Sequence, residues 1–187
     1  MISSDPKICI IGLQKTGTTS IANALRKMGR SMGHATTRLA REVDWSMLDP
    51  TMQIEKIAVD VLAQNDGVSD SPYGFIYEAI DEAFPRTKFI LSIRDTQSWL
   101  ESYRTFFPDQ NNRLRQWMFG VPTFRGHEEV YRDVFDNQNN AMRRYFAQRP
   151  ADFLEMNLAE GDGWAKLTGF LGSEYLPFRH DNRQSKQ

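Results

Sequence analysis

Short apolar runs alternate along this chain with longer segments in which apolar residues recur every three or four positions. Residues 8–11 and 89–93 are continuous apolar runs, broken only by Ser92, which is typical of strands buried on both faces of a parallel sheet. The other segments expected to form strands are 31–35, 67–69 and 153–156. Helical spacing marks the segments 18–28, 50–63, 73–84, 96–106, 128–148 and 164–171.

This alternation of strands with helices predicts an α/β fold. The expected architecture has three layers, α/β/α, around a central parallel sheet of about four to five strands. At 187 residues we expect a single domain over 1–187, with a frayed polar tail from about Arg179. Ligands of open parallel sheets bind beyond the carboxyl ends of the strands, so the turns that follow the apolar runs are where we expect the chemistry.

Composition and charge narrow the class of protein only slightly. The 23 Lys and Arg residues and the 24 Asp and Glu residues give a net charge of −1, so neither nucleic acid nor an anionic membrane is expected as a partner. The single cysteine, Cys9, lies inside an apolar run and is expected to be a small core residue, without an internal disulfide. No apolar stretch approaches the roughly 20 residues that a membrane-spanning helix needs.

The most informative segment is the loop from Gly12 to Ser20, which reads Gly-Leu-Gln-Lys-Thr-Gly-Thr-Thr-Ser. It follows the first apolar run and precedes the first helical pattern. Glycines let the backbone turn tightly around an anion, which the N–H groups and the dipole at the helix start then attract. Lys15 adds a positive charge, and Thr18 and Thr19 add hydroxyl donors. The segment therefore predicts a phosphate-binding loop.

This loop departs from the Walker A motif, in which lysine directly follows the second glycine. Here Thr18 holds that position, and Lys15 comes two residues before Gly17. A lysine inside the loop followed by Gly-Thr-Thr resembles instead the 5′-phosphosulfate loop of the sulfotransferases.

A second motif supports this resemblance. Sulfotransferases carry a strand that ends in arginine and a following helix with a serine eight residues later, and this pair grips the 3′-phosphate of the sulfuryl donor. The present chain has Arg94 after the 89–93 run and Ser102 in the next helical segment. The resemblance is closest to the short sulfotransferase-like proteins of the P-loop superfamily, and it continues into the tail at 160–172. Residues 104–150 carry no such motif.

The resemblance implies an enzyme that moves a sulfuryl group from 3′-phosphoadenylyl sulfate (PAPS) to a hydroxyl or amine of an acceptor. It releases 3′-phosphoadenosine 5′-phosphate (PAP) and requires no metal. The loop would hold the 5′-phosphate and the sulfonate, and Lys15 would meet the charge that develops on the leaving phosphate. The residues expected to bind the donor are Gln14, Lys15, Thr16, Gly17, Thr18, Thr19, Ser20, Arg94 and Ser102.

The acceptor hydroxyl also needs a general base. Cytosolic family members use a histidine after a central strand and others use a carboxylate, but residues 68–72 contain no histidine. Asp70 is the first candidate, and a turn-forming or helix-capping role is its alternative. His34 is the second candidate, because related short members often have a histidine after their second strand; its alternative is a loop histidine without a role. Together with Lys15, these are the predicted catalytic residues.

Aromatic residues give weaker indications, because they mostly report packing. Trp164 and Phe170 could stack on adenine, but their helical spacing favours the core. The residues that could line a pocket for an apolar or aromatic acceptor are Trp117, Phe119, Phe124 and Tyr131.

Two other classes of protein stay open from the sequence. A nucleotide kinase or triphosphatase would also use such a loop, but the Gly-Lys-[Ser/Thr] sequence is missing and Arg94 before Asp95 would repel Mg²⁺. A catalytically silent PAP-binding or scaffold protein would fit the short chain. Small-molecule, lipid and glycan acceptors are all open, as is the oligomeric state. Because the sequence has neither the anchor nor the disulfides of many eukaryotic sulfotransferases, we expect a cytoplasmic protein.

Overall fold

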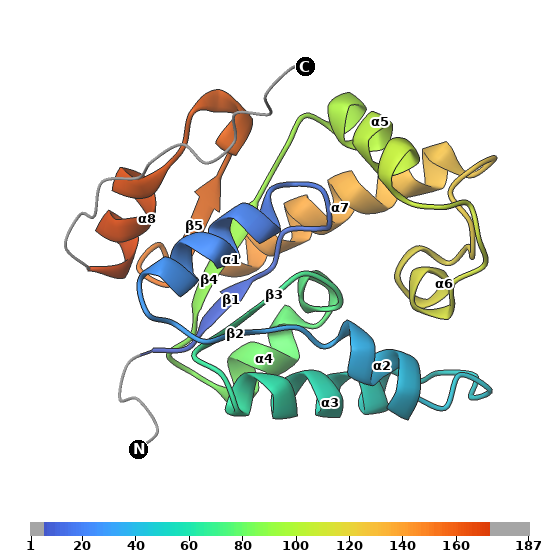
Figure 1. Cartoon of the computed structure of the whole chain (residues 1–187), viewed down its shortest axis with the longest axis horizontal. Helices are drawn as coiled ribbons and strands as arrows, with labels where there is room; N and C mark the ends of the chain where they lie inside the picture. Colours follow the sequence, from blue (N-terminus) through green and yellow to red (C-terminus); the bar gives the residue numbers. More distant parts are fainter. Residues whose placement is uncertain (1–5, 173–187) are drawn as a thin grey trace.

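Five parallel strands form the sheet at the centre of this computed structural model, which describes residues 6–172 (Figure 1). In chain order they are β1 (Ile8–Ile10), β2 (Met32–Gly33), β3 (Gly67–Ser69), β4 (Lys88–Ser92) and β5 (Phe153–Met156). Their order across the sheet is β2-β3-β1-β4-β5, and every neighbouring pair is parallel. The two longest apolar runs therefore lie at the middle of the sheet, as expected of strands that are buried on both faces.

The central strands send alternate side chains into two separate cores. Cys9 of β1 pairs in register with Phe89 of β4, and both face the larger core. Their neighbours Ile10 and Ile90 also pair, and they face the smaller core on the other side of the sheet. Cys9 is fully buried, as predicted for a small core residue. Cores on both faces confirm the predicted three-layer α/β/α architecture.

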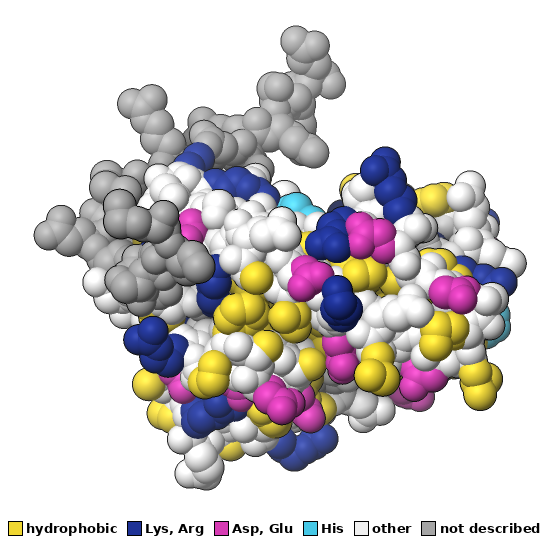
Figure 2. All heavy atoms as spheres, turned by 90° about the horizontal axis from the view of Figure 1, so that it is seen from below, with side chains coloured by type: hydrophobic (Ala, Val, Ile, Leu, Met, Phe, Trp, Pro, Cys, Tyr) yellow, Lys and Arg dark blue, Asp and Glu magenta, His cyan; other side chains and the backbone are white. Residues whose placement is uncertain are grey.

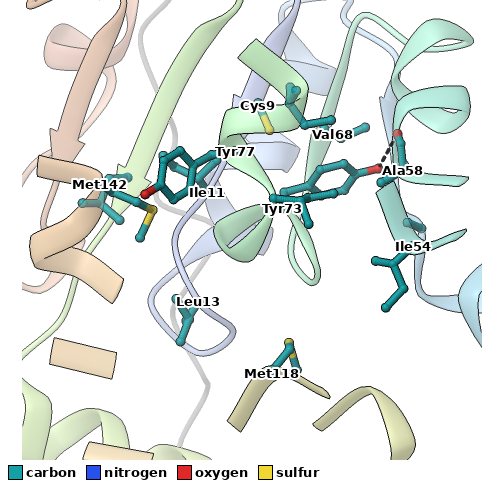
Figure 3. Close-up of a cluster of buried hydrophobic side chains, with 14 of the residues drawn as sticks. Cys9, Ile11, Leu13, Ile54, Ala58, Val68, Tyr73, Tyr77, Met118 and Met142 are labelled. Atoms are coloured by element: carbon teal, nitrogen blue, oxygen red, sulfur yellow. Dashed lines mark hydrogen bonds between the residues drawn. The ribbon is translucent and has the colours of Figure 1, made fainter. Parts of the chain in front are cut away.

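Helices cover both faces of the sheet (Figure 1). The smaller core packs against α1 (Thr18–Lys27) and α8 (Trp164–Leu171). The helices on the larger core are α2 (Thr36–Glu42), α3 (Thr51–Ala63), α4 (Tyr77–Ala83), α5 (Thr96–Phe106), α6 (Arg113–Phe119) and α7 (Glu128–Phe146). Figure 3 shows part of this larger core, where Tyr73 lies beside Val68 and directs its hydroxyl toward the Ala58 carbonyl. Short 3₁₀ turns occur at η1 (Tyr73–Phe75) and η2 (Leu158–Glu160).

Two helices that the sequence did not predict, α2 and α6, lack a clear apolar period. Helix α2 buries only Leu39 among its residues, and α6 buries Arg115 together with Met118 and Phe119. A single buried apolar residue in α2, and a charged side chain on the buried face of α6, leave no pattern by which an amphipathic helix is recognised.

The prediction of one helix over 73–84 is wrong, because the chain forms η1 and then α4, separated at Ile76. Gly74 in η1 lies against the end of β1, so closely that a Cβ there would be 2.5 Å from the Ile11 carbonyl oxygen. The Gly74 carbonyl also accepts a hydrogen bond from Gln138 Nε2 at 2.5 Å. These contacts hold the first turn apart from the helix. The second strand is also shorter than the predicted 31–35, and the tail expected from Arg179 lies outside the described residues.

The step from β1 into the following loop is fixed by the close approach of β4. A Cβ at Gly12 would lie 2.0 Å from Ser92 Oγ and 2.4 Å from the Ser92 carbonyl oxygen. No side chain fits there unless the backbone of β4 moves. Gly12 is therefore required by packing, in addition to any role in an anion-binding loop.

We expect Gly12→Ala to lower the free energy of unfolding by about 1–3 kcal/mol, because it overpacks the contact with Ser92. For a chain of this length each kcal/mol lowers the melting temperature by about 2–4 °C, which thermal unfolding can measure. Gly169→Ala is the matched control, because a Cβ at this helical position meets no atom within 4 Å. It should leave stability unchanged or raise it by up to about 1 kcal/mol. Equal melting temperatures for the two variants would contradict the packing argument.

Candidate active site

The loop between β1 and α1 turns through two residues with positive φ, Lys15 at 72° and Gly17 at 104°. Gly17 is the N-cap residue of α1, and its carbonyl accepts the first helical hydrogen bond, from Ile21 N at 3.2 Å. The N–H groups of the preceding positions have no partner inside the helix. Within residues 6–172 no side chain caps this helix start. Its N–H groups and its dipole are thus available to an anion.

Two hydrogen bonds fasten this loop to neighbouring elements. Thr16 Oγ1 lies 2.6 Å from Ser92 Oγ at the end of β4. Trp99 Nε1, on α5, donates to the Gln14 carbonyl oxygen at 2.7 Å. Since Thr16 and Trp99 are both buried, these bonds are protected from competing water. The loop is therefore held in one position relative to β4 and α5.

A cavity of about 380 Å³, a volume typical of small-molecule sites, lies where the loop, the turn after β3 and α5 meet. Figure 1 shows the β1–α1 loop pointing toward α5. The predicted site residues that line the cavity are Gln14, Lys15, Gly17, Thr18, Thr19, Ser20, Asp70, Arg94 and Ser102. Three separate strand-to-helix junctions thus contribute to one space, as expected at the carboxyl ends of parallel strands.

Arg94 and Ser102 reach the cavity from the junction between β4 and α5. The Asp95 carboxylate caps α5 by accepting a hydrogen bond from Ser98 N at 2.8 Å, which fixes the helix start beside Arg94. Ser102 is half-buried, about two turns further along the same helix. Within the described part of the chain, no hydrogen bond or ion pair engages the Arg94 guanidinium. Its five donors are thus free to meet an anionic ligand.

Two aromatic residues that the sequence analysis did not anticipate, Phe106 and Phe107, also line the cavity. The Lys15 ammonium lies over the Phe106 ring, 3.5 Å from its centroid, in a cation–π contact. The sequence could have indicated Phe106 as a cavity residue, because it comes four residues after Ser102, a spacing that puts both on one face of α5. Phe106 is 63% exposed, so its ring stands at the mouth of the cavity.

Asp70 lies in the turn after β3 and also has a positive φ, 76°. Its Oδ1 accepts a hydrogen bond from Ser71 N at 2.8 Å. Burial raises the pKa of the Asp70 carboxyl above its ordinary value, while the Ser71 N–H, the Gln14 side chain and the Lys15 charge act in the opposite direction. The net effect is a raised pKa, which is common for carboxyls in functional sites.

His34 and Thr16 are the predicted site residues that do not line this cavity. His34 is exposed after β2, with Nε2 3.0 Å from Arg26 Nη2 and Nδ1 3.2 Å from the Ser69 carbonyl oxygen. A guanidinium only donates, so Nε2 accepts and Nδ1 carries the proton. Both ring nitrogens are therefore engaged. The backbone N–H and the hydroxyl of Thr16 both donate hydrogen bonds to the Leu13 carbonyl oxygen, at 3.3 and 2.6 Å.

The aromatic residues proposed for an acceptor pocket pack in the larger core instead. Phe119 and Tyr131 stack with centroids 3.9 Å apart, and Phe124 is buried against Tyr131. Trp117 is half-buried, and its Nε1 donates to Thr51 Oγ1 at 3.0 Å. At the other end of the described chain, Trp164 is buried in the smaller core, as its helical spacing favoured.

Metal-binding clusters and membrane-spanning helices are both absent from residues 6–172. No group of three or more His, Cys, Asp or Glu side chains there has an arrangement that could hold a metal ion. In the same part of the chain, no helix has the length and apolar character needed to cross a membrane. Figure 2 shows acidic and basic side chains interspersed over one face of the molecule, in keeping with the net charge of −1.

A parallel sheet whose first strand leads through a glycine loop into a helix defines a P-loop-like α/β domain. A family model described as "Sulfotransferase domain" matches residues 7–129, about two-thirds of the chain. The chain therefore belongs to the sulfotransferase-domain family. The match includes the loop, Asp70, Arg94 and Ser102.

One curated relative is the Ava biosynthesis cluster protein M of Aspergillus versicolor, which is 28% identical over 106 residues. The match covers 51% of this chain and 41% of that protein, so this region corresponds to about two-fifths of the relative's length. Among solved structures, shikimate kinase from Acinetobacter baumannii in complex with shikimate aligns with a TM-score of 0.42 and 13% identity. That alignment covers 79% of this chain and 96% of the kinase chain.

We expect Asp70→Asn to raise the melting temperature at neutral pH. A raised pKa means that folding disfavours the ionised carboxyl, so the cost is absent below the unfolded-state pKa and grows as the pH rises through the folded-state pKa. Asparagine removes the charge, keeps an oxygen for Ser71 N and tolerates positive φ. Thermal unfolding measured at neutral pH and at about pH 3 should show a gain that disappears at the lower pH.

Asp66→Asn provides a control of opposite sign. Hydrogen bonds from the Ser31 backbone N–H and hydroxyl lower the pKa of the Asp66 carboxyl, so its ionised form stabilises the fold at neutral pH. This variant should lose stability there. A loss of stability in both variants would show that burial does not disfavour the Asp70 charge.

Proposed function

We propose that this protein is a sulfotransferase that moves a sulfuryl group from PAPS to a hydroxyl or amine of an acceptor. The observation that carries the proposal is the convergence of the β1–α1 loop with Arg94 and Ser102 on one cavity. PAPS and PAP carry phosphate groups at two positions of the nucleoside, so their site needs two separate anion-binding groups. Membership of the sulfotransferase-domain family supports the same reaction class.

The residues on the cavity wall fit such a donor. The N–H groups at the start of α1 and the hydroxyls of Thr18 and Thr19 would hold the 5′-phosphate and the sulfonate. Arg94 would hold the 3′-phosphate through its planar fork, a geometry that lysine cannot reproduce, with Ser102 as a further donor. Glycine suits position 17 of this loop, because the φ of 104° disfavours any side chain and a Cβ there would lie 2.6 Å from Leu158 Cδ1.

When bound, PAPS supplies an activated sulfuryl group attached to a phosphate leaving group. Lys15 would stabilise the negative charge that grows on that phosphate, a role in which a fixed cation is most effective. The Phe106 ring under its ammonium limits where the side chain can go. Lys15 is thereby kept at the cavity rather than extended into solvent.

Asp70 would take the proton from the acceptor hydroxyl at its carboxylate. Its raised pKa makes it a stronger base than an ordinary aspartate, which brings it closer to the working pH. His34 is the second candidate, but a base needs a free nitrogen, and Nε2 is occupied by the Arg26 guanidinium. The arrangement therefore favours Asp70.

Calorimetric titration with PAP, adenosine 5′-phosphate and ATP plus Mg²⁺ tests the donor. We expect PAP to bind most tightly. Arg94→Lys should weaken PAP by about 10-fold to 100-fold and adenosine 5′-phosphate little, because only PAP carries the 3′-phosphate. Arg86→Lys, an exposed position outside the cavity, is the control. Equal weakening of both nucleotides would rule out the 3′-phosphate role. Binding of ATP, with PAP no tighter than adenosine 5′-phosphate, would favour a kinase or triphosphatase.

Single-turnover transfer from labelled PAPS to a broad acceptor panel separates the catalytic roles. We expect Lys15→Ala to lower the rate by about 10²–10³ and Asp70→Asn by about 10²–10⁴. His34→Asn should change the rate by less than about tenfold if Asp70 is the base. The reverse order for Asp70 and His34 would exchange their roles. Tight PAP binding without transfer to any acceptor by the unaltered protein would favour a silent binding protein.

A further inference from the structure

A second cavity, of about 340 Å³, adjoins the first and shares Gln14 and Phe107 with it. It lies between the loop and the helices α2 and α6, which are on the side of the molecule away from α8 (Figure 1). Its lining residues are Gln14, Thr36, Ala40, Trp45, Phe107, Asn112, Arg113, Leu114 and Arg115. The two shared residues place the cavities side by side.

The charged residues of this lining are two arginines, Arg113 and Arg115, and the lining contains no Asp or Glu. Arg115 is only 7% exposed. Its Nη1 donates to the Pro108 carbonyl at 3.0 Å, and its guanidinium lies 4.8 Å from the centre of the Phe107 ring. Over residues 6–172, no carboxylate lies within 4.0 Å of Arg115.

A buried guanidinium without a carboxylate is costly, because burial removes water and nothing of opposite charge replaces it. The rings of Phe107 and Tyr103, with centroids 4.8 and 5.8 Å from the guanidinium, and one carbonyl satisfy only part of its five-donor fork. An anion in the cavity would complete the set. A planar carboxylate matches this fork best, since it can accept two parallel hydrogen bonds.

The rest of the wall is apolar or neutral. Trp45, Leu114 and Ala40 present apolar surface, and Gln14, Thr36 and Asn112 present uncharged hydrogen-bonding groups. A volume of about 340 Å³ is at the small end of ligand sites. These properties together describe a small molecule with a carboxylate at one end and an aromatic or aliphatic body.

We propose that this second cavity is the acceptor site and that it selects a hydroxylated carboxylic acid with an apolar body. This inference rests on the proposed function, because the molecule in the first cavity is taken to be the sulfuryl donor. The carboxylate lies against Arg115, and the body packs on Trp45 and Leu114. The hydroxyl lies toward the wall shared at Gln14 and Phe107, on the side where Asp70 lines the donor cavity.

Titration with para-hydroxyphenylpropanoate and with its methyl ester tests this selection, because esterification adds one methyl group and removes the negative charge at one end. Both titrations are run with and without PAP on the full chain. We expect the acid to bind about 10-fold to 100-fold more tightly than the ester. Arg115→Met should bring this ratio close to one while leaving PAP affinity unchanged. Arg86→Met, the matched exposed control, should keep the ratio.

The outcomes separate this inference from the proposed function. Equal binding of acid and ester, binding of neither at millimolar concentration, or a full acid preference in Arg115→Met would each overturn the acceptor assignment. Failure of PAP to bind would overturn the donor assignment and, with it, the acceptor role, but the preference of the second cavity for a carboxylate would stand, because that preference is read without PAP. If Arg115→Met fails to fold, Arg113→Met takes its place, since Arg113 is exposed. It should reduce the preference severalfold, and an unchanged ratio would count against the proposal.

Discussion

The hydrogen bond from Trp99 Nε1 to the Gln14 carbonyl is the contact on which the geometry of the site depends. It joins the β1–α1 loop to α5, which carries Ser102 and begins beside Arg94. Trp99 is fully buried and stacks on Phe135 of α7, with centroids 4.1 Å apart and an angle of 17° between the rings. The separation between the two proposed anion-binding groups is thus set by the packing of α5 on α7. The proposed donor, with phosphates at two positions, would need such a fixed separation, because small misplacements weaken positioning steeply.

The cavity also concentrates features that do not favour stability. Lys15 and Asp70 are the two non-glycine residues with positive φ within residues 6–172, and both line it. Such a conformation costs roughly 1–3 kcal/mol when nothing compensates for it. The Arg94 guanidinium adds a cation that has no ion pair in the same part of the chain. Buried contacts at Thr16 and Trp99 hold the loop in spite of this strain. These contacts explain how the loop keeps a backbone conformation that Lys15 alone would disfavour.

How far the sequence predicts this structure depends on whether a residue acts through local pattern or through tertiary contact. The central strands and the helix Thr96–Phe106 were predicted because continuous apolar runs and helical spacing are local properties. The convergence of the loop, Asp70 and Arg94 followed from the rule that ligands bind at the carboxyl ends of parallel strands. The hydrogen bond by which Thr16 holds the loop to β4 could not be predicted, since its partner, Ser92, is distant in sequence. Helix α6 escaped prediction for a related reason, because its buried face carries Arg115.

The position of Arg115 shows that the two cavities are built from different kinds of structural element. The proposed donor side is built from strand ends and from the start of α1, elements that the sheet itself fixes. Apart from Gln14, the second cavity is built from α2, α6, the segment after α2 and the segment before α6, which lie outside the sheet and form its covering layer. Changes there alter the shape and charge of the cavity without disturbing the central strands. Arg115 is the exception, because it packs on Phe107 and also lines the cavity, so its replacement alters the core and the cavity together. An apolar side chain would cost less at such a position, and the proposed carboxylate ligand would account for the charge there.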